Sequence, residues 1–401
     1  MSTIMRVSMR ITILSLLFAS AACSAQSAKS VPVTQSDEPR LSMSAPAEVP
    51  IEKIGDFYYV NVAVNGHPFR FTLETGANFF AVSNRLAHTL GLRIDSVSRE
   101  RGSMAIVHID SLVIGSAKLF QFTAIATPLF ESFPDTFDGI ISIAVLKQFL
   151  ATIDFPHRVL RLERGTLPEA NGRDILAIAG RDSGGRVDVM LDLGSVRTAA
   201  VLDTRSFIGL LLPDSLEQRL SFVDSVRTTS RARGPSLGSF TLRRGQLNAP
   251  VRLGSFEAEK PLVTLRDRGG SVIGMPVLEQ FGITLDVVNK RLRFSRPDGS
   301  WRLTIPQEPL TQRGANSPAS GPPLGFALAP RADGSLTIVG VVQNSNAERA
   351  GLREGDTLVE LDGVAAAQMN VSVFRATAAK RTPVKIVVER EGKRLEFVVS
   401  P

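Results

Sequence analysis

Val272-Ile-Gly-Met-Pro-Val-Leu-Glu-Gln-Phe-Gly-Ile-Thr-Leu-Asp-Val287 is the stretch that decides the fold, because the chain contains a second copy of it. Asp138–Arg164 aligns with Gly270–Arg296 without a gap, and ten of the 27 aligned positions are identical. Each copy predicts an apolar strand and a short helix, followed by two strands joined by a turn. The identical pairs include Val145/Val277, Leu146/Leu278, Gln148/Gln280, Phe149/Phe281 and Asp154/Asp286.

A second pair of related segments lies upstream of these copies. Phe69–Ala77 and Val187–Ser195 each begin with apolar residues at every second position and end in a glycine turn. In both segments a carboxylate, Glu74 or Asp192, ends the strand just before the turn. The sequence therefore predicts two similar β-rich lobes, 51–166 and 173–297, each presenting one carboxylate on a loop.

These motifs resemble the pepsin/retropepsin aspartyl protease superfamily, in which an apolar strand precedes Asp-Thr/Ser-Gly-Ala/Ser. The downstream half of that motif, two apolar residues and a glycine, is matched by Val272-Ile273-Gly274 and partly by Ile140-Ile141-Ser142. The resemblance implies a cleft between two lobes and a catalytic pair formed by Glu74 and Asp192, with carboxyl oxygens within about 5 Å of each other. It also implies supporting loop residues, which are Thr75, Gly76, Ala77, Gly194, Ser195 and Gly274.

Such a pair works because two adjacent carboxylates cannot both ionise. The ionised member takes a proton from water, and the protonated member polarises the scissile carbonyl. Three positions depart from the family pattern: Glu74 replaces aspartate, Leu193 replaces the Thr or Ser, and Ser142 replaces a glycine. A misplacement of about 1 Å, the length that Glu74 adds, can reduce the rate about a hundredfold.

The C-terminal segment 322–401 resembles a PDZ domain. Leu324-Gly325-Phe326 matches the loop whose N–H groups bind a peptide carboxylate, and Ala350–Leu358 matches the Ala-Gly-Leu-x-x-Gly-Asp stretch. A linker rich in proline, 298–321, precedes it. The expected fold class is thus mainly β: a two-lobed aspartic-protease-like unit plus an α+β PDZ domain.

The N-terminus predicts export. Arg6 and Arg10 precede an apolar stretch that is too short to span a bilayer as a helix, and small residues follow it. Residues 1–25 are therefore expected to be a signal peptide and 26–50 a flexible tether. Cys23, the only cysteine, resembles a bacterial lipoprotein acylation site, although Ser20 departs from that pattern; ordinary cleavage after Ala25 is the alternative. The predicted location is the periplasm or cell envelope, with or without a lipid anchor.

Composition excludes other classes of function. The net charge of +7 comes from scattered lysines and arginines, without the basic and aromatic patches of a nucleic-acid-binding surface. The four histidines lack metal-ligand spacing, so neither a metal nor another cofactor is expected. The sequence favours an exported aspartic-type endopeptidase that acts on peptide or protein substrates, with a PDZ domain that binds C-termini. The alternative is a catalytically degenerate, peptide-binding adaptor of the cell envelope.

Overall fold

The computed structural model describes residues 12–13, 39–54, 57–98, 104–127, 130, 137–179, 185–234, 238–305, 324–330, 335–341, 345–369, 377 and 382–400. The larger of two compact units contains the described residues of 39–226 and 245–307. The smaller contains Thr12–Ile13 and the described residues of 227–244 and 308–401. The predictions for Cys23 and for the signal peptide fall outside the described residues, apart from Thr12–Ile13. The sequence also predicts two helical stretches in the PDZ-like segment, near 346–351 and 370–379, and the second falls outside the described residues apart from Thr377.

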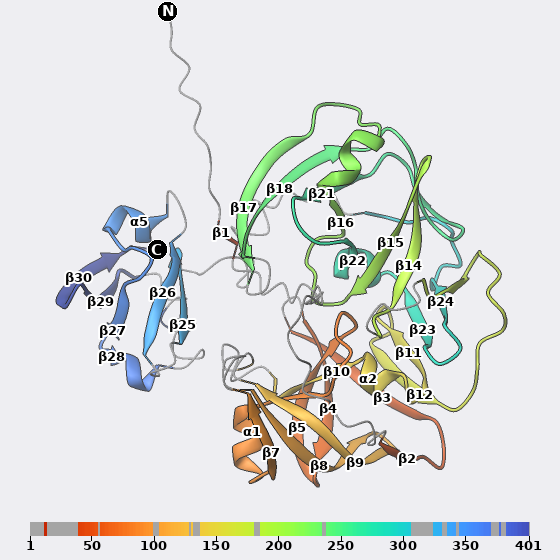
Figure 1. Ribbon diagram of the computed structural model, residues 1–401, viewed down its shortest axis with the longest axis horizontal. Helices are drawn as coiled ribbons and strands as arrows, with labels where there is room; N and C mark the ends of the chain where they lie inside the picture. The colour runs from red at the N-terminus through yellow and green to blue at the C-terminus, as the bar shows by residue number, and fades with distance from the viewer. Residues whose placement is uncertain are drawn as a thin grey trace, which may run out of the picture. The chain divides into compact units, whose positions relative to one another are not determined.

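The first lobe of the larger unit is built from strands with short helices between them (Figure 1). Its elements are β2 (Arg40–Ser42), β3 (Ala47–Ile54), β4 (Phe57–Val64), β5 (His67–Glu74), β6 (Ala81–Ser83), α1 (Asn84–Thr89), β7 (Ile94–Ser98), β8 (Met104–Ile114), β9 (Ala117–Thr127), β10 (Gly139–Ser142), α2 (Ile143–Leu146), β11 (Leu150–Asp154) and β12 (Val159–Glu163).

The second lobe repeats this plan. Its elements are β13 (Ile175–Ala177), β14 (Asp188–Leu193), β15 (Val196–Asp203), β16 (Leu210–Pro213), the 3-10 helix η2 (Asp214–Arg219), β19 (Val251–Leu253), β20 (Phe256–Ala258), β21 (Leu262–Arg266), β22 (Ser271–Gly274), α3 (Met275–Leu278), β23 (Gly282–Asp286) and β24 (Arg291–Ser295). The order β22-α3-β23-β24 matches β10-α2-β11-β12, as the internal repeat predicts.

Both lobes hold their central strand in the same way. In the first, β5 pairs in parallel with β10, with Ser142 in register with Glu74. In the second, β15 pairs in parallel with β22, with Gly274 in register with Asp203. Residues of all four strands, among them Leu73, Ile141, Leu202 and Ile273, belong to one core that extends through both lobes. Each lobe thus fixes the end of one buried strand beside the downstream motif.

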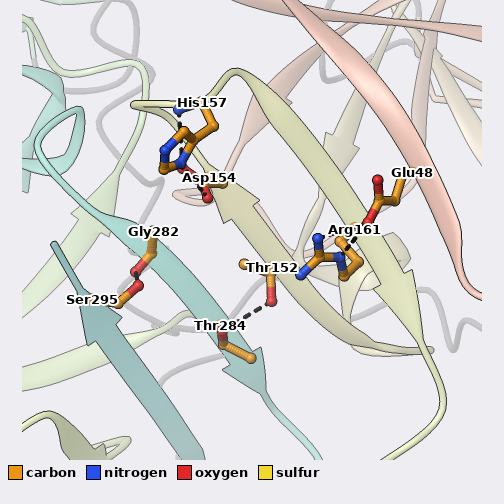
Figure 2. A network of polar contacts seen from close by, with 8 residues as sticks. All are labelled: Glu48, Thr152, Asp154, His157, Arg161, Gly282, Thr284 and Ser295. Atoms are coloured by element: carbon orange, nitrogen blue, oxygen red, sulfur yellow. Dashed lines mark hydrogen bonds and ion pairs between the residues drawn. The ribbon is translucent and has the colours of Figure 1, made fainter. Parts of the chain in front are cut away.

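The lobes are joined by an antiparallel sheet in which the repeat pairs with itself (Figure 2). Strands β11 and β23 pair with Thr152 opposite Thr284, and the two hydroxyls lie 2.9 Å apart. Because these threonines are equivalent in the repeat, a pseudo-two-fold axis passes between them. Asp154 accepts a hydrogen bond from the backbone N–H of His157, and Asp286 accepts one from Asn289 N–H. Both aspartates therefore close turns.

The predicted tether needs a correction. Arg40–Ser42 pairs with β9, and Ala47–Ile54 pairs with both β4 and β12. Ala47 and Val49 belong to the core and are buried. Residues 40–42 and 47–50 are thus part of the first lobe, because their alternating apolar side chains pack beneath it.

The C-terminal part of the smaller unit is a six-stranded sheet with one described α-helix (Figure 1). Its elements are β25 (Phe326–Pro330), β26 (Leu336–Val341), α5 (Asn346–Ala350), β27 (Thr357–Leu361), β28 (Val364–Ala365), η3 (Ala366–Gln368), β29 (Val384–Arg390) and β30 (Lys393–Val399). The hairpin of β17 (Arg227–Gly234) and β18 (Gly238–Gln246) lies mostly in this unit by sequence range, and the two-residue strand β1 (Thr12–Ile13) pairs with β17. No helix of the described residues is long and apolar enough to cross a membrane.

Candidate active site

Two buried carboxylates end the central strands of the two lobes. Glu74 is the last residue of β5 and Asp203 the last of β15, and they are 2% and 3% exposed. A Cβ placed on Gly76 would lie 3.1 Å from Asp203 Oδ1 and 3.2 Å from Glu74 Oε1. Both carboxylates therefore border the same small space, and the loop after Glu74 has no room there for a side chain.

Two threonines lock the loops together by a reciprocal exchange of hydrogen bonds. Thr75 N–H donates to Thr204 Oγ1 at 3.1 Å, and Thr204 N–H donates to Thr75 Oγ1 at 3.2 Å. Thr75 Oγ1 donates to Leu202 O and Thr204 Oγ1 to Leu73 O, each at 2.8 Å. Each hydroxyl thus satisfies the opposite lobe's backbone in a buried place, where an unpaired polar group would be costly. This exchange makes Glu74 and Asp203 equivalent positions.

The prediction that Asp192 partners Glu74 is wrong. Asp192 lies on β14 opposite Arg197, close to the turn between β14 and β15, and Asp203 ends β15 at the far end of that hairpin. Six residues of strand from Arg197 to Asp203 span about 20 Å. The Asp192 side chain is 41% exposed, and its Oδ1 lies 2.9 Å from Arg197 Nε in a surface ion pair.

The prediction that Gly194 and Ser195 support a catalytic loop is also wrong, because they form the turn of the same hairpin as Asp192. Gly194 has a φ of +66°, which a hairpin turn requires. Leu193 is a core residue and stands in no catalytic loop. The sequence pattern equates β14 with β5, whereas in the structure β15 is the strand equivalent to β5. The missed signal is Val201-Leu202-Asp203-Thr204, an apolar strand followed by Asp-Thr.

The other expected loop residues lie beside the pair. Thr75 and Gly76 are described above, and Ala77 accepts a hydrogen bond from Ile143 N–H. Gly274 lies against the loop after Asp203, where an added Cβ would be 2.2 Å from Ile208 O. Its counterpart Ser142 donates its hydroxyl to Phe79 O at 2.6 Å. The serine thus keeps the contact between the downstream motif and the loop after Glu74.

Arg205 is a site residue that the motif pattern in the sequence does not predict. It follows Asp203-Thr204, at the position that Gly76 holds in the first lobe. Its side chain is 1% exposed, and Nε lies 3.5 Å from Glu74 Oε2. Cζ lies 4.9 Å from the ring centroid of Phe57 and 5.3 Å from that of Phe137. A buried cation therefore stands next to the carboxylate pair.

The two carboxyl groups differ in proton affinity. Burial, and then the charge of Asp203, raise the pKa of Glu74 to about 8, although Arg205 opposes the shift. Burial raises the pKa of Asp203 only to about 6, because the Arg205 backbone N–H donates to its carboxylate and the charges of Arg205 and Arg266 favour the ionised form. Between these values Glu74 holds a proton and Asp203 is ionised.

In the PDZ-like unit, Leu324 and Phe326 are buried in the apolar core. Gly325 lies between them with a φ of +80°, and Ser345 Oγ donates to its carbonyl at 3.3 Å. Strand β25, which follows this loop, pairs within its sheet with β26 alone. Among the described residues, no group of three or more His, Cys, Asp or Glu side chains could hold a metal ion.

The fold and the paired carboxylates define an aspartic-protease-type unit of two lobes. Residues 60–145 match the aspartyl protease family, and residues 337–390 match the PDZ domain family. The chain therefore carries an aspartyl-protease-family domain and a C-terminal PDZ domain.

Similar solved structures include a retropepsin-like aspartic protease from Rickettsia conorii, with 21% identity, 32% of this chain and 97% of that chain covered, and a TM-score of 0.24. Another is the HtrA3 PDZ domain bound to a phage-derived ligand, with 20% identity, 19% and 81% covered, and a TM-score of 0.18. A search of curated proteins gives no match.

Proposed function

We propose that the larger unit is an aspartic-type endopeptidase whose catalytic pair is Glu74 and Asp203. The observation that carries this proposal is the burial of both carboxylates around Gly76, at equivalent strand ends locked by Thr75 and Thr204. Such a pair activates a water molecule against a peptide carbonyl without a metal or a covalent intermediate.

The unequal proton affinities assign the two roles. With its pKa at about 6, Asp203 is ionised near neutral pH and takes a proton from the attacking water. With its pKa at about 8, Glu74 keeps its proton and donates a hydrogen bond to the scissile carbonyl. The water oxygen adds to the carbonyl carbon, the amine leaves with a proton, and one water is consumed per bond. We expect activity between about pH 6 and pH 8.

The hydrolysis of a denatured protein at neutral pH tests this assignment. Asp203→Asn is expected to abolish cleavage, whereas Asp192→Asn, an equally conservative change at the exposed aspartate, is expected to leave it unchanged. A pepstatin-type inhibitor is expected to block the wild-type chain. Full activity of Asp203→Asn would overturn the proposed pair.

A second candidate, a non-cleaving peptide-binding protein of the cell envelope, is favoured by one observation. Arg205 occupies a glycine position of the motif and places a cation beside Glu74. The same assay separates the candidates, because a binding protein would retain the peptide uncleaved. Equilibrium binding of a labelled peptide to the wild-type chain, followed by mass analysis of the peptide, distinguishes capture from cleavage.

The PDZ domain is proposed to bind the C-termini of peptides or proteins. The loop Leu324–Phe326 would present backbone N–H groups to a terminal carboxylate, and the peptide would add as a strand to the edge of β25. Two buried apolar residues of this loop anchor it to the core.

Export is proposed from the N-terminal sequence alone, together with a location in the periplasm or the cell envelope. If Cys23 carries lipid, Cys23→Ala is expected to move the protein from the membrane fraction to the soluble fraction. An unchanged distribution would show that Cys23 does not anchor the chain.

A further inference from the structure

Arg205 occupies a position from which a side chain is directed at the carboxylate pair. Gly76 and Arg205 each follow a threonine of the reciprocal exchange, so they are equivalent in the two loops. At Gly76 an added Cβ would meet Asp203 Cγ at 3.1 Å and Glu74 Oε1 at 3.2 Å. Arg205 has a long side chain at the equivalent position, and its Nε reaches Glu74 of the opposite lobe.

The guanidinium of Arg205 is held by the first lobe. Its Cζ lies over the rings of Phe57 and Phe137, which come from the start of β4 and from the segment just before β10. Ring faces attract a cation, and the attraction is stronger where water is excluded. Arg205 therefore bridges from its own loop to the lobe that carries Glu74, and burial leaves it little freedom to move.

The two carboxylates are held differently. Asp203 accepts a hydrogen bond from the backbone N–H of Arg205 at 2.9 Å, within its own loop. Glu74 has one methylene more, and its Oε2 faces the Arg205 guanidinium of the other loop. The longer acid and the arginine thus occur together in one site and lie against each other.

We propose that Arg205 is a positioning residue that holds the Glu74 carboxyl opposite Asp203, so that Glu74 and Arg205 work as one unit. This inference rests on the proposed peptidase function. It predicts that Glu74→Asp alone and Arg205→Gly alone, each of which introduces the residue of the family pattern, lower the activity. Both changes together are expected to restore a working carboxylate pair.

The charged groups around Glu74 are few in the described residues. Asp203 faces it from the end of β15, Arg205 from the following loop, and Arg266, at the end of β21, acts on Asp203. Asp267 in turn acts on Arg266. Because the Arg205 charge favours the ionised form of both carboxyls, its removal raises their pKa values.

A mutational cycle on the full chain tests the inference, with kcat/KM for a denatured protein substrate measured from pH 5 to pH 9. Glu74→Asp alone and Arg205→Gly alone are each expected to lower kcat/KM about a hundredfold. The double variant is expected to recover at least tenfold over either single variant. Arg205→Gln is expected to shift both limbs of the pH profile to higher pH, and Arg205→Lys to shift them less. Arg197→Gln, a change at an exposed arginine of β15, serves as the control and is expected to leave the profile in place.

The outcomes separate this inference from the proposed function. If the wild type cleaves and the losses of the two single variants simply multiply, the positioning role is overturned and the peptidase remains. If neither the wild type nor any variant cleaves, the proposed peptidase function is overturned. The pH dependence of the urea unfolding midpoint then decides whether Arg205 and Glu74 are paired. Arg205→Gln, but not Arg197→Gln, must then move that dependence to higher pH, and an unmoved curve rejects the pairing.

Discussion

Arg205 Nε lies 3.5 Å from Glu74 Oε2, and the two side chains come from the loops of opposite lobes. Thr75 and Thr204 form matching hydrogen bonds, so this part of the site is two-fold symmetric. The contact between Arg205 and Glu74 has no counterpart in the other loop, where Gly76 stands, and it breaks that symmetry. The asymmetry extends to the protons, because the pKa of Glu74 is raised to about 8 and that of Asp203 to about 6. One lobe therefore carries the carboxyl that keeps its proton near neutral pH, and the other carries the carboxyl that is ionised.

The stability of the larger unit is expected to fall as pH rises toward 8. The pKa of Glu74 is raised in the folded chain from 4.5 to about 8, so burial of the neutral carboxyl stabilises the fold fully below pH 4.5. That contribution is lost as pH rises through the folded pKa, at about 1.4 kcal/mol per pH unit. Asp203 adds a similar loss between 3.8 and about 6. Urea unfolding followed between pH 5 and pH 9 measures the slope.

Glu74→Gln is the variant that isolates this effect. It removes one titrating group without changing the side-chain shape, so the slope between pH 6.5 and pH 8 is expected to flatten. Asp192→Asn provides the control, because that carboxylate is exposed and paired with Arg197. Stability that rises with pH across this range would contradict the assigned protonation of Glu74.

The sequence predicts the architecture well because the repeat is dense in core residues. Val145/Val277 and Leu146/Leu278 are buried in both copies, and the pairing of Thr152 with Thr284 follows from their equivalence. The spacing of apolar residues in the core indicates the fold, and substitutions at the site do not change that spacing. The PDZ domain is recognisable in the sequence for the same reason, because its glycine turns and apolar strands have the spacing that is typical of PDZ domains.

The site could be predicted only in part. Glu74 keeps the Thr75-Gly76-Ala77 that follows it, so its loop is recognisable. Asp203 is followed by Thr204-Arg205, and the arginine disrupts the pattern that identifies such a loop. Asp192-Leu193-Gly194 ends a strand before a glycine turn as well, but it belongs to the first strand of the hairpin. Periodicity alone does not distinguish the two strands of a hairpin; only the pairing of β15 with β22 does.

Thr204→Val is expected to destabilise the junction of the two lobes by about 1–3 kcal/mol. The change removes the donor to Leu73 O and the acceptor for Thr75 N–H, and both of these backbone groups are buried. Thr204→Ser keeps the hydroxyl and is expected to retain most of the stability. Urea unfolding measures both variants. A Thr204→Val variant as stable as the wild type, combined with a loss of stability in Thr204→Ser, would mean that the methyl group, and not the hydrogen-bond exchange, matters.

In the PDZ domain, Arg390→Gln is expected to cost about 3–5 kcal/mol of domain stability. Asp356 is buried, and its oxygens lie 2.6 Å and 2.7 Å from Arg390 Nε and Nη2, so loss of the cation leaves a buried charge unpaired. Lys385→Gln breaks the exposed ion pair with Glu396 and is expected to cost less than about 1 kcal/mol. Amide hydrogen exchange of β29 compares the two, and similar protection in both variants would refute the structural role of Asp356.

The proposed binding of a terminal carboxylate by the PDZ loop leads to a prediction at Gly325. This residue has a φ of +80°, and an added Cβ would lie 2.5 Å from Ser345 Cβ, so Gly325→Ala must displace the loop. Gly363 has a similar φ of +86° with no other atom within 4 Å of an added Cβ, so Gly363→Ala carries the same backbone strain away from the loop. Fluorescence anisotropy with a labelled peptide that has an apolar, free C-terminus measures affinity. Gly325→Ala is expected to weaken binding at least tenfold, and Gly363→Ala to leave it unchanged.

Amidation of the peptide tests the same contact from the side of the ligand. It is expected to weaken binding to the wild type by about 1.5–3 kcal/mol for each charge-assisted hydrogen bond that is lost. Equal affinity for the free and amidated peptides would show that this loop does not bind a carboxylate, whatever Gly325→Ala does to the fold.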